Sequence, residues 1–120
     1  MSSGKHRVRT ASVIAAISAV LFITGSRAQA GTQTGYVTFL EVRDTDGLIY
    51  FGLSGTASGK PTCAVFPAWT LPNEGSETGK KLFALLVSAR TAGQQVSVNG
   101  KNTCVRWGDQ EDVASIRVTD

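Results

Sequence analysis

Histidine is almost absent from this chain. Its single histidine is His6, so the sequence from residue 31 onward contains none. Without an imidazole, that part of the chain cannot build a Ser-His-Asp or Cys-His catalytic site, and it lacks the commonest zinc ligand. We therefore expect a protein that is not an enzyme and that uses no cofactor and no metal ion. A small hydrolase that works through carboxylates is the minor alternative.

The sequence also has no apolar run long enough to cross a membrane. The longest run, residues 11–23, is shorter than the roughly 20 residues that a spanning helix needs. It follows basic residues and precedes Ala28-Gln29-Ala30, the small-x-small pattern of a signal peptidase site. We predict that residues 1–30 are a signal peptide that is removed, and that the mature chain begins at Gly31. The protein would then be secreted or periplasmic, with no membrane segment after processing; a buried helix is the alternative.

Positive charge is scarce once residues 1–30 are set aside. They carry four of the 12 Lys and Arg and none of the nine Asp and Glu, so their removal changes the formal net charge from +3 to −1. A protein that binds nucleic acid neutralises phosphates with clustered Lys and Arg. No such cluster follows residue 30, and we expect no nucleic-acid partner.

Only two cysteines are present, Cys63 and Cys104. Two cysteines in a small exported domain indicate one disulfide bond, with two free thiols as the alternative. A bond that closes a loop of roughly 40 residues would stabilise the fold by about 4 kcal/mol in the chain-entropy model. A contribution of this size matters because so short a chain buries only a modest core.

Alternating side chains predict strands in the first half of the domain. Residues 35–54 read as a β-hairpin with its turn at 44–47, since β-branched and aromatic residues alternate on both sides of an Asp- and Gly-rich turn. A third strand is expected at 62–66, where it would carry Cys63. Pro and Gly residues then predict an irregular segment at 67–77.

One helix is predicted at 77–92. Ser76 is placed as its N-cap and Gly93 as the left-handed residue after its last turn. Apolar side chains recur at helical spacing, and we expect all of them to face the core: Leu82, Phe83, Leu85, Leu86 and Ala89.

The second half of the domain is predicted to return to strands. These are a strand at 95–98, a tight turn at Asn99-Gly100, a strand at 103–107 that carries Cys104, and a short last strand at 113–118. A helical turn near residue 112 is the alternative for the last strand.

The predicted order is three strands, one helix and two or three further strands. It is the order of a small oligonucleotide/oligosaccharide-binding (OB) barrel. We therefore expect one mainly β, α+β domain over residues 31–120: an OB-fold-like barrel of five to six strands with one disulfide.

A set of residues spread over positions 34–107 and just beyond has a familiar spacing. They are Gly35, Tyr50-Phe51, Gly55, Cys63, Trp69, Asn73-Glu74, Gly79-Lys80, Leu82 to Leu86, Gly93 to Val96, Cys104, Trp107 and Glu111. This pattern resembles the B subunit of subtilase cytotoxin and its small exported bacterial relatives. In that family the B subunit forms a ring of five and binds sialylated glycans, which directs a catalytic subunit into cells. The resemblance implies a glycan-binding module and a homopentamer.

The resemblance also implies a position for the glycan site. The family uses a serine hydroxyl just before the glycine that opens the first strand, and Thr34 before Gly35 matches it. The family's tyrosine at the end of the strand after the helix is replaced here by Gly100, and its polar residue in the earlier connector by Thr56-Ala57-Ser58. We predict weak glycan binding, or binding of a different sugar, at Thr34 with help from Trp69.

Two tryptophans are many for a chain of this size, and the faces of aromatic rings commonly stack against sugars and bases. Trp69 is expected in a proline-bounded loop, either as an anchor of that loop or as a contact with a ligand or a second subunit. Trp107 follows Cys104 by three residues and is expected to pack over the disulfide, with a ligand contact as the alternative.

Acidic residues offer no clear metal or catalytic site. Asp109, Glu111 and Asp112 lie close together, but they lack the spacing and central Gly of a calcium loop, so a solvated acidic turn is expected. Glu41 and Glu74 would have to meet in space to act as an acid–base pair. We predict a secreted, non-enzymatic binding or assembly module whose ligand is a glycan or a protein. The alternative is a periplasmic or envelope accessory protein with the same fold and no glycan binding.

Overall fold

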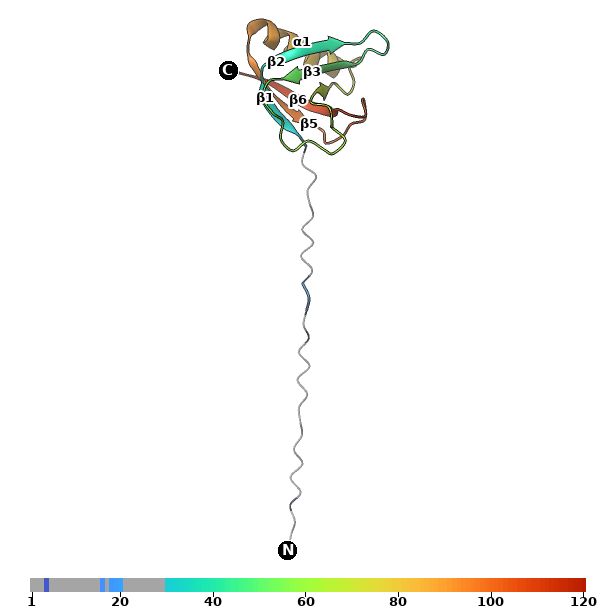
Figure 1. Ribbon diagram of the computed structural model, residues 1–120, viewed down its shortest axis with the longest axis vertical. Helices are drawn as coiled ribbons and strands as arrows, with labels where there is room; N and C mark the ends of the chain where they lie inside the picture. The colour runs from blue at the N-terminus through green and yellow to red at the C-terminus, as the bar shows by residue number, and fades with distance from the viewer. Residues whose placement is uncertain (1–3, 5–15, 17, 21–29) are drawn as a thin grey trace.

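The structure is a computed structural model that describes residues 4, 16, 18–20 and 30–120 (Figure 1). Most of the predicted signal peptide lies outside the described residues. In the part of the chain that is described, no helix has the length and apolar character needed to cross a membrane.

The domain is mainly β with one helix, as predicted. Its elements are β1 (Thr32–Gly35), β2 (Val37–Val42), β3 (Ile49–Leu53), β4 (Trp69–Thr70), α1 (Glu77–Ala92), β5 (Gln95–Gly100) and β6 (Glu111–Thr119). The strands form one mixed sheet in the order β1-β5-β6-β4-β3-β2, in which only the β4–β6 pair is parallel.

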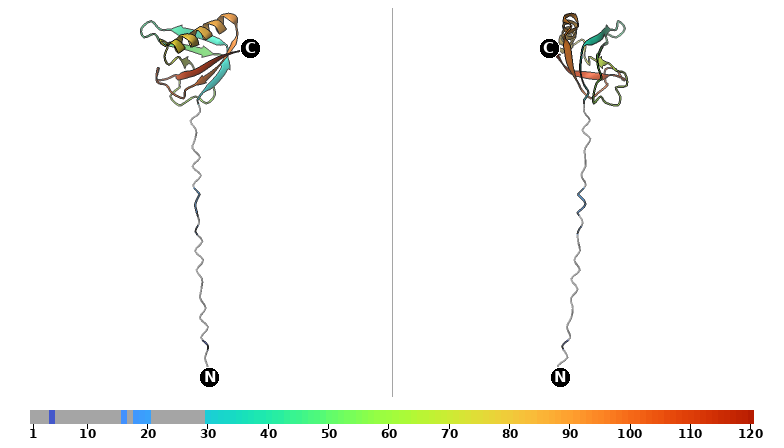
Figure 2. Two further views of the ribbon diagram at one scale, coloured as in Figure 1. Left: turned by 180° about the vertical axis from the view of Figure 1, so that it is seen from behind. Right: turned by 60° about the vertical axis from the view of Figure 1, so that its left-hand side comes forward.

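The sheet closes on itself because its two outer strands are consecutive in the chain. Only Tyr36 separates β1 from β2, and β1 pairs with β5 while β2 pairs with β3. Together β1 and β2 therefore act as one bent strand that joins both edges, which leaves few unpaired edge groups. Helix α1 packs against β2, β5 and β6, beside the strands (Figure 2). The result is the predicted OB-fold-like barrel.

The helix ends where the sequence predicts. The Ser76 hydroxyl accepts a hydrogen bond from the Gly79 N–H at 3.0 Å, and Gly93 has φ 66° at the other end. Leu86 and Ala89 are buried in the core, with Leu82 and Phe83 partly buried against it.

Leu85 departs from that prediction, since its side chain is 38% exposed. The helix covers one side of a small barrel, so only a narrow stripe of its surface has strands to pack against.

Two of the predicted strands are wrong. Residues 62–66 and 103–107 lie in loops, and the barrel strands follow them as β4 and β6. The Cys63–Cys104 disulfide is present as predicted, but it joins these two loops instead of two strands. A Phe66 N–H to Asp109 C=O hydrogen bond of 3.0 Å also links them. The disulfide is compatible with an oxidising location outside the cytosol.

The predicted Asn99-Gly100 turn is also wrong, because both residues belong to β5. A Cβ added to Gly100 would lie 1.7 Å from Glu111 Oε2. Glycine is therefore required here by the close approach of a side chain on the neighbouring strand, and not by a turn. The last strand is present but longer than predicted, beginning at Glu111.

Candidate functional site

Strands β2 and β3 place two aromatic side chains on their outer face. Leu40 pairs with the buried Phe51 on the inner face, so the next pair, Glu41 and Tyr50, faces outward. Phe39 lies two residues before Glu41 and faces outward as well, whereas the bulge between Val37 and Phe39 lets Val37 face the core. The Phe39 and Tyr50 rings meet edge to face with their centroids 5.8 Å apart.

Arg43 continues this surface from the end of β2. Its guanidinium carbon lies 4.1 Å from the ring centroid of Trp107, whose side chain is 37% exposed. Trp107 is therefore a surface residue of the 101–110 loop, which corrects the expectation that it is buried by packing over the disulfide. A guanidinium over an indole face is a favourable cation–π pair.

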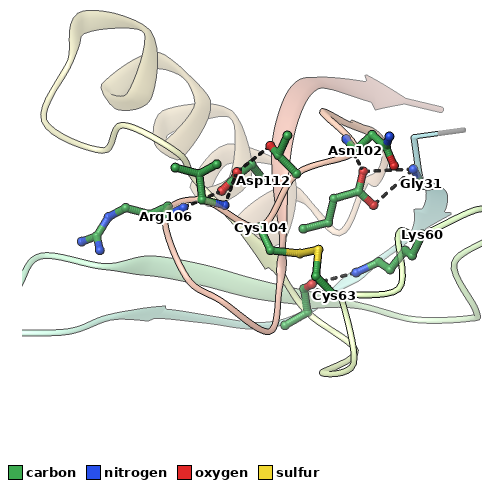
Figure 3. Close-up of a disulfide and its surroundings, with 11 residues drawn as sticks. Gly31, Lys60, Cys63, Asn102, Cys104, Arg106 and Asp112 are labelled. Carbon is green, nitrogen blue, oxygen red and sulfur yellow. Dashed lines mark hydrogen bonds between the residues drawn. A yellow bond between two sulfur atoms is a disulfide. The ribbon is translucent and has the colours of Figure 1, made fainter. Parts of the chain in front are cut away.

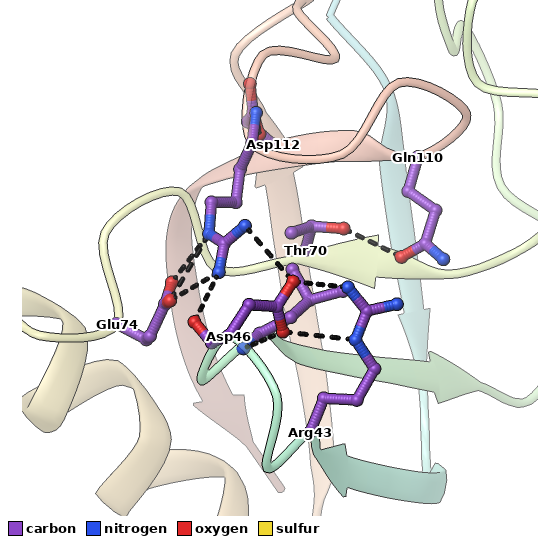
Figure 4. Close-up of polar contacts among 8 residues, drawn as sticks. Arg43, Asp46, Thr70, Glu74, Gln110 and Asp112 are labelled. Carbon is purple, nitrogen blue, oxygen red and sulfur yellow. Dashed lines mark hydrogen bonds and ion pairs between the residues drawn. The ribbon is translucent and has the colours of Figure 1, made fainter.

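Asp46 holds Arg43 in this position. Its carboxylate forms an ion pair with Arg43 and also accepts a hydrogen bond from the Leu48 N–H at 3.1 Å (Figure 4). The Arg43 hydrogen bond, followed by that of Leu48, lowers the pKa of Asp46 to about 2. The carboxylate therefore stays ionised at all but the most acidic pH.

Arg106 joins this turn to two other loops. Its Nε donates to both oxygens of Glu74 at 3.2 and 3.1 Å, and its Nη2 donates to Glu74 Oε1 at 2.7 Å and to the Asp46 carbonyl at 3.1 Å. The Arg106 side chain, as hydrogen-bond donor, lowers the pKa of Glu74. These bonds fix the segments around Asp46, Glu74 and Arg106 against one another.

We call Phe39, Arg43, Tyr50 and Trp107 the aromatic–arginine surface. It lies between the turn at 43–48 and the loop at 101–110, the two loops that flank the ligand-binding face of OB barrels. The Asp46 ion pair orders the Arg43 side chain in the absence of a ligand, and such ordering lowers the entropic cost of binding in general. The chemistry of this surface suits recognition, because the exposed Phe39 and Trp107 rings and the half-buried Tyr50 ring lie beside an arginine that a carboxylate holds in place.

The sequence does not predict this surface, although Trp107 is one of the two tryptophans considered as ligand contacts. Phe39, Glu41 and Tyr50 could have been grouped from the hairpin register, once the bulge was known. The Arg43–Trp107 contact joins two segments far apart in the sequence, and no local pattern indicates it. The Arg43–Trp107 contact is therefore a product of the tertiary fold.

Thr34 and Trp69 are not brought together. Thr34 is exposed on the outer face of β1, and its hydroxyl lies 2.9 Å from the Ser97 hydroxyl. Trp69 is fully buried in β4; its Nε1 donates to Gln33 Oε1 at 2.8 Å, and Lys60 Nζ lies 3.9 Å from its ring centroid. The core position of Trp69 corrects the expectation of a loop residue, and its ring has no exposed face for a sugar.

The predicted solvated acidic turn is wrong for two of its three members. Glu111 and Asp112 are fully or almost fully buried. The Asp112 carboxylate accepts hydrogen bonds from the Thr103 hydroxyl at 2.7 Å and from the Val105 N–H at 2.8 Å. Within the described residues, no group of three or more His, Cys, Asp and Glu is arranged to hold a metal ion.

A separate hollow of about 410 Å³ lies beside the 54–68 loop. Gln33, Lys60 and Val65 are among its lining residues, and Gln33 is held by hydrogen bonds to the carbonyls of residues 53–55. Thr34 points to the other side of β1, so this hollow does not include it.

Fold and surface together define the chain as a small, disulfide-bonded, OB-fold-like barrel with an exposed aromatic–arginine surface. No family model, no curated protein and no solved structure matches the chain.

Proposed function

We propose that this protein is an exported, non-enzymatic binding module that holds a glycan on the aromatic–arginine surface. The observation that carries the proposal is the Arg43–Trp107 stack beside the Phe39–Tyr50 pair, on the loops that OB barrels use for ligands. Sugar rings present C–H faces to aromatic side chains and hydroxyls to charged hydrogen-bonding groups. This surface offers both kinds of contact side by side.

The charges of the surface favour a hydroxyl-rich ligand over a polyanion. Arg43 and Arg106 are each paired with a carboxylate, and Glu41 adds a further negative charge beside Tyr50. Glu41, as hydrogen-bond acceptor, raises the pKa of Tyr50, so the phenol stays protonated at neutral pH. A nucleic acid would be repelled by these carboxylates, and the two arginines that could bind its phosphates are already paired.

The resemblance to toxin B subunits supports the same proposal from a different direction. It adds the expectation of a ring of five, in which weak single sites act together through multivalency. The exposed Thr34 hydroxyl on β1 is retained as a second candidate site. Size-exclusion chromatography with light scattering on residues 31–120 tests the oligomeric state separately from binding.

A glycan array, followed by titration with the best ligand, tests the proposal. Trp107→Ala and Tyr50→Ala should each weaken binding at least tenfold, because each removes one stacking face. Val105→Ala is the matched control: Val105 lies in the same loop and is 84% exposed, and its change should leave affinity within about twofold.

The variant Thr34→Ala separates the two candidate sites. If it alone abolishes binding, the glycan lies at the family position and the aromatic–arginine surface is not the site. If the array shows no binding to any sugar, the glycan proposal fails. The accessory-protein alternative then stands, supported by exposed Val65, Phe66 and Val105 on the disulfide-linked loops.

A further inference from the structure

The carboxylate of Glu111 occupies a closed pocket at the start of β6. Its side chain has no exposed area. Two glycines form the pocket walls: a Cβ on Gly31 would lie 2.3 Å from Oε1, and one on Gly100 would lie 1.7 Å from Oε2. The barrel therefore leaves space for this carboxylate by omitting two side chains.

Neutral groups satisfy the carboxylate. The Gly31 N–H lies within hydrogen-bond distance of both oxygens, at 3.2 and 3.0 Å, and the Asn102 N–H donates to Oε2 at 3.0 Å (Figure 3). Among the residues that the structure describes, none forms an ion pair with Glu111 within 4.0 Å. Burial lowers the pKa of Lys60, and the negative charge of Glu111 opposes that effect from a distance, but the Lys60 ammonium donates its hydrogen bond to the Ala68 carbonyl at 2.8 Å and not to the carboxylate. A buried carboxylate without a counter-ion is costly.

Gly31 is also the residue that the predicted processing site would make the new N-terminus. A peptide N–H has one hydrogen and cannot serve both oxygens fully. An α-ammonium nitrogen at the same place has three hydrogens and a positive charge, so it would serve both and neutralise the carboxylate.

We propose that Glu111 is a built-in binding site for the α-ammonium group that cleavage between Ala30 and Gly31 creates. This inference rests on the predicted cleavage and is independent of the proposed glycan binding. Processing would replace a hydrogen bond from a neutral N–H with a buried ion pair.

The ion pair would fasten β1, the strand through which the barrel closes. The Gly31 carbonyl already accepts from the Gly100 N–H at 2.8 Å, and Thr32 exchanges hydrogen bonds with Ser58. The position of the charge is critical, because each extra residue moves the terminal nitrogen by about 3.8 Å along the chain. A chain that begins at Ala30 would carry its charge outside the pocket.

A double-mutant cycle tests the proposal. It compares chains that begin at Gly31 and at Ala30, each with Glu111 or with Glu111→Gln, made by cleaving fusions directly before the chosen residue. With Glu111 present, the Ala30 start should raise the equilibrium constant for unfolding in urea at least tenfold. In the Glu111→Gln background the two starts should differ by less than twofold. An equal effect of the extra residue in both backgrounds would overturn the proposal.

A second measurement needs no substitution, in case Glu111→Gln does not fold. The α-amine of each folded Glu111 chain is acylated with an N-hydroxysuccinimide ester, and its rate is compared with that of exposed Lys81. We expect the amine of the Gly31 start to react at least tenfold more slowly than that of the Ala30 start, relative to Lys81. Equal relative rates would show that the terminal amine is free, and the proposal would fail.

Discussion

At the scale of single residues, two neighbouring carboxylates organise the long loop before β6. Glu111 and Asp112 point to opposite sides of the strand, as successive strand residues do. Glu111 accepts from the Asn102 N–H, whereas Asp112 accepts from Thr103 and from the N–H groups of Val105 and Arg106. The buried side chains of Glu111 and Asp112 therefore hold the backbone of the loop that carries Trp107.

The pH dependence of stability should reveal the Arg43–Asp46 pair. The folded pKa of Asp46, about 2, lies below its ordinary value of 3.8. Its contribution to the free energy of unfolding is therefore fully present above about pH 4 and is lost as the pH falls towards 2. In Asp46→Asn the midpoint of urea unfolding should therefore vary less with pH over that range than in the unchanged chain. The Asp46 pKa, followed by NMR, should rise in Arg43→Gln; an unchanged value would contradict this account.

The close approach at Gly100 gives a second prediction at this scale. Gly100→Ala should lower the free energy of unfolding by about 3 kcal/mol, because the new methyl group displaces a buried carboxylate. Gly108→Ala is the control, since a Cβ there meets nothing within 4 Å, and it should change stability by less than about 0.5 kcal/mol. Urea unfolding of both variants checks this; equal losses would argue against the clash.

At the scale of elements, the ends of α1 and the loops around it are fixed by different means. The helix is capped by its own sequence neighbours, Ser76 and Gly93. The turn at 43–48 and the loop at 101–110 are instead linked to each other by Arg106, which bonds to Glu74 and to the Asp46 carbonyl. The candidate site is thus built from elements that hold one another in place.

The helix cap can be tested with two serines of the same helix region. Ser76→Ala removes the acceptor for the Gly79 N–H and should cost about 1 kcal/mol of stability. Ser88→Ala, on the exposed face of the helix, should change stability by less than about 0.5 kcal/mol. Urea unfolding measures both, and a cost at Ser88 as large as that at Ser76 would rule out capping as the cause.

At the scale of the whole molecule, the barrel and the disulfide close the chain in two ways. The strand order joins β1 and β2 across the sheet, and the Cys63–Cys104 bond ties together two loops that contain no barrel strand. The disulfide therefore restrains the parts of the chain that the sheet leaves out.

Removing both cysteines should expose this contribution. The pair closes a loop with a sequence separation of 41, and Cys63→Ala/Cys104→Ala should lose about 4 kcal/mol of stability in the chain-entropy model. Urea unfolding with and without reductant measures it. Reductant should lower the stability of the unchanged chain to that of the variant and leave the variant unaffected. Alkylation of the denatured, unreduced protein should label neither cysteine; full labelling would contradict the bond.

The sequence by itself determined the elements whose signals are local. The hairpin that became β2 and β3 and the helix at 77–92 follow from alternation, helical spacing and caps, all of which link residues a few positions apart. The disulfide followed from having two cysteines and a predicted export signal. The order of the predicted elements then sufficed to predict an OB-fold-like barrel.

Only the tertiary structure decided which residues outside the hairpin and the helix are buried and which are exposed. Residues 103–107 alternate like a strand, yet they form a loop because Asp112 takes up their backbone N–H groups. Trp69 is buried and Trp107 exposed, although both stand in turn-rich sequence. Burial and side-chain partners depend on contacts between segments far apart in the chain, such as Arg43 with Trp107 and Gly31 with Glu111, and no local pattern in a single sequence carries that information.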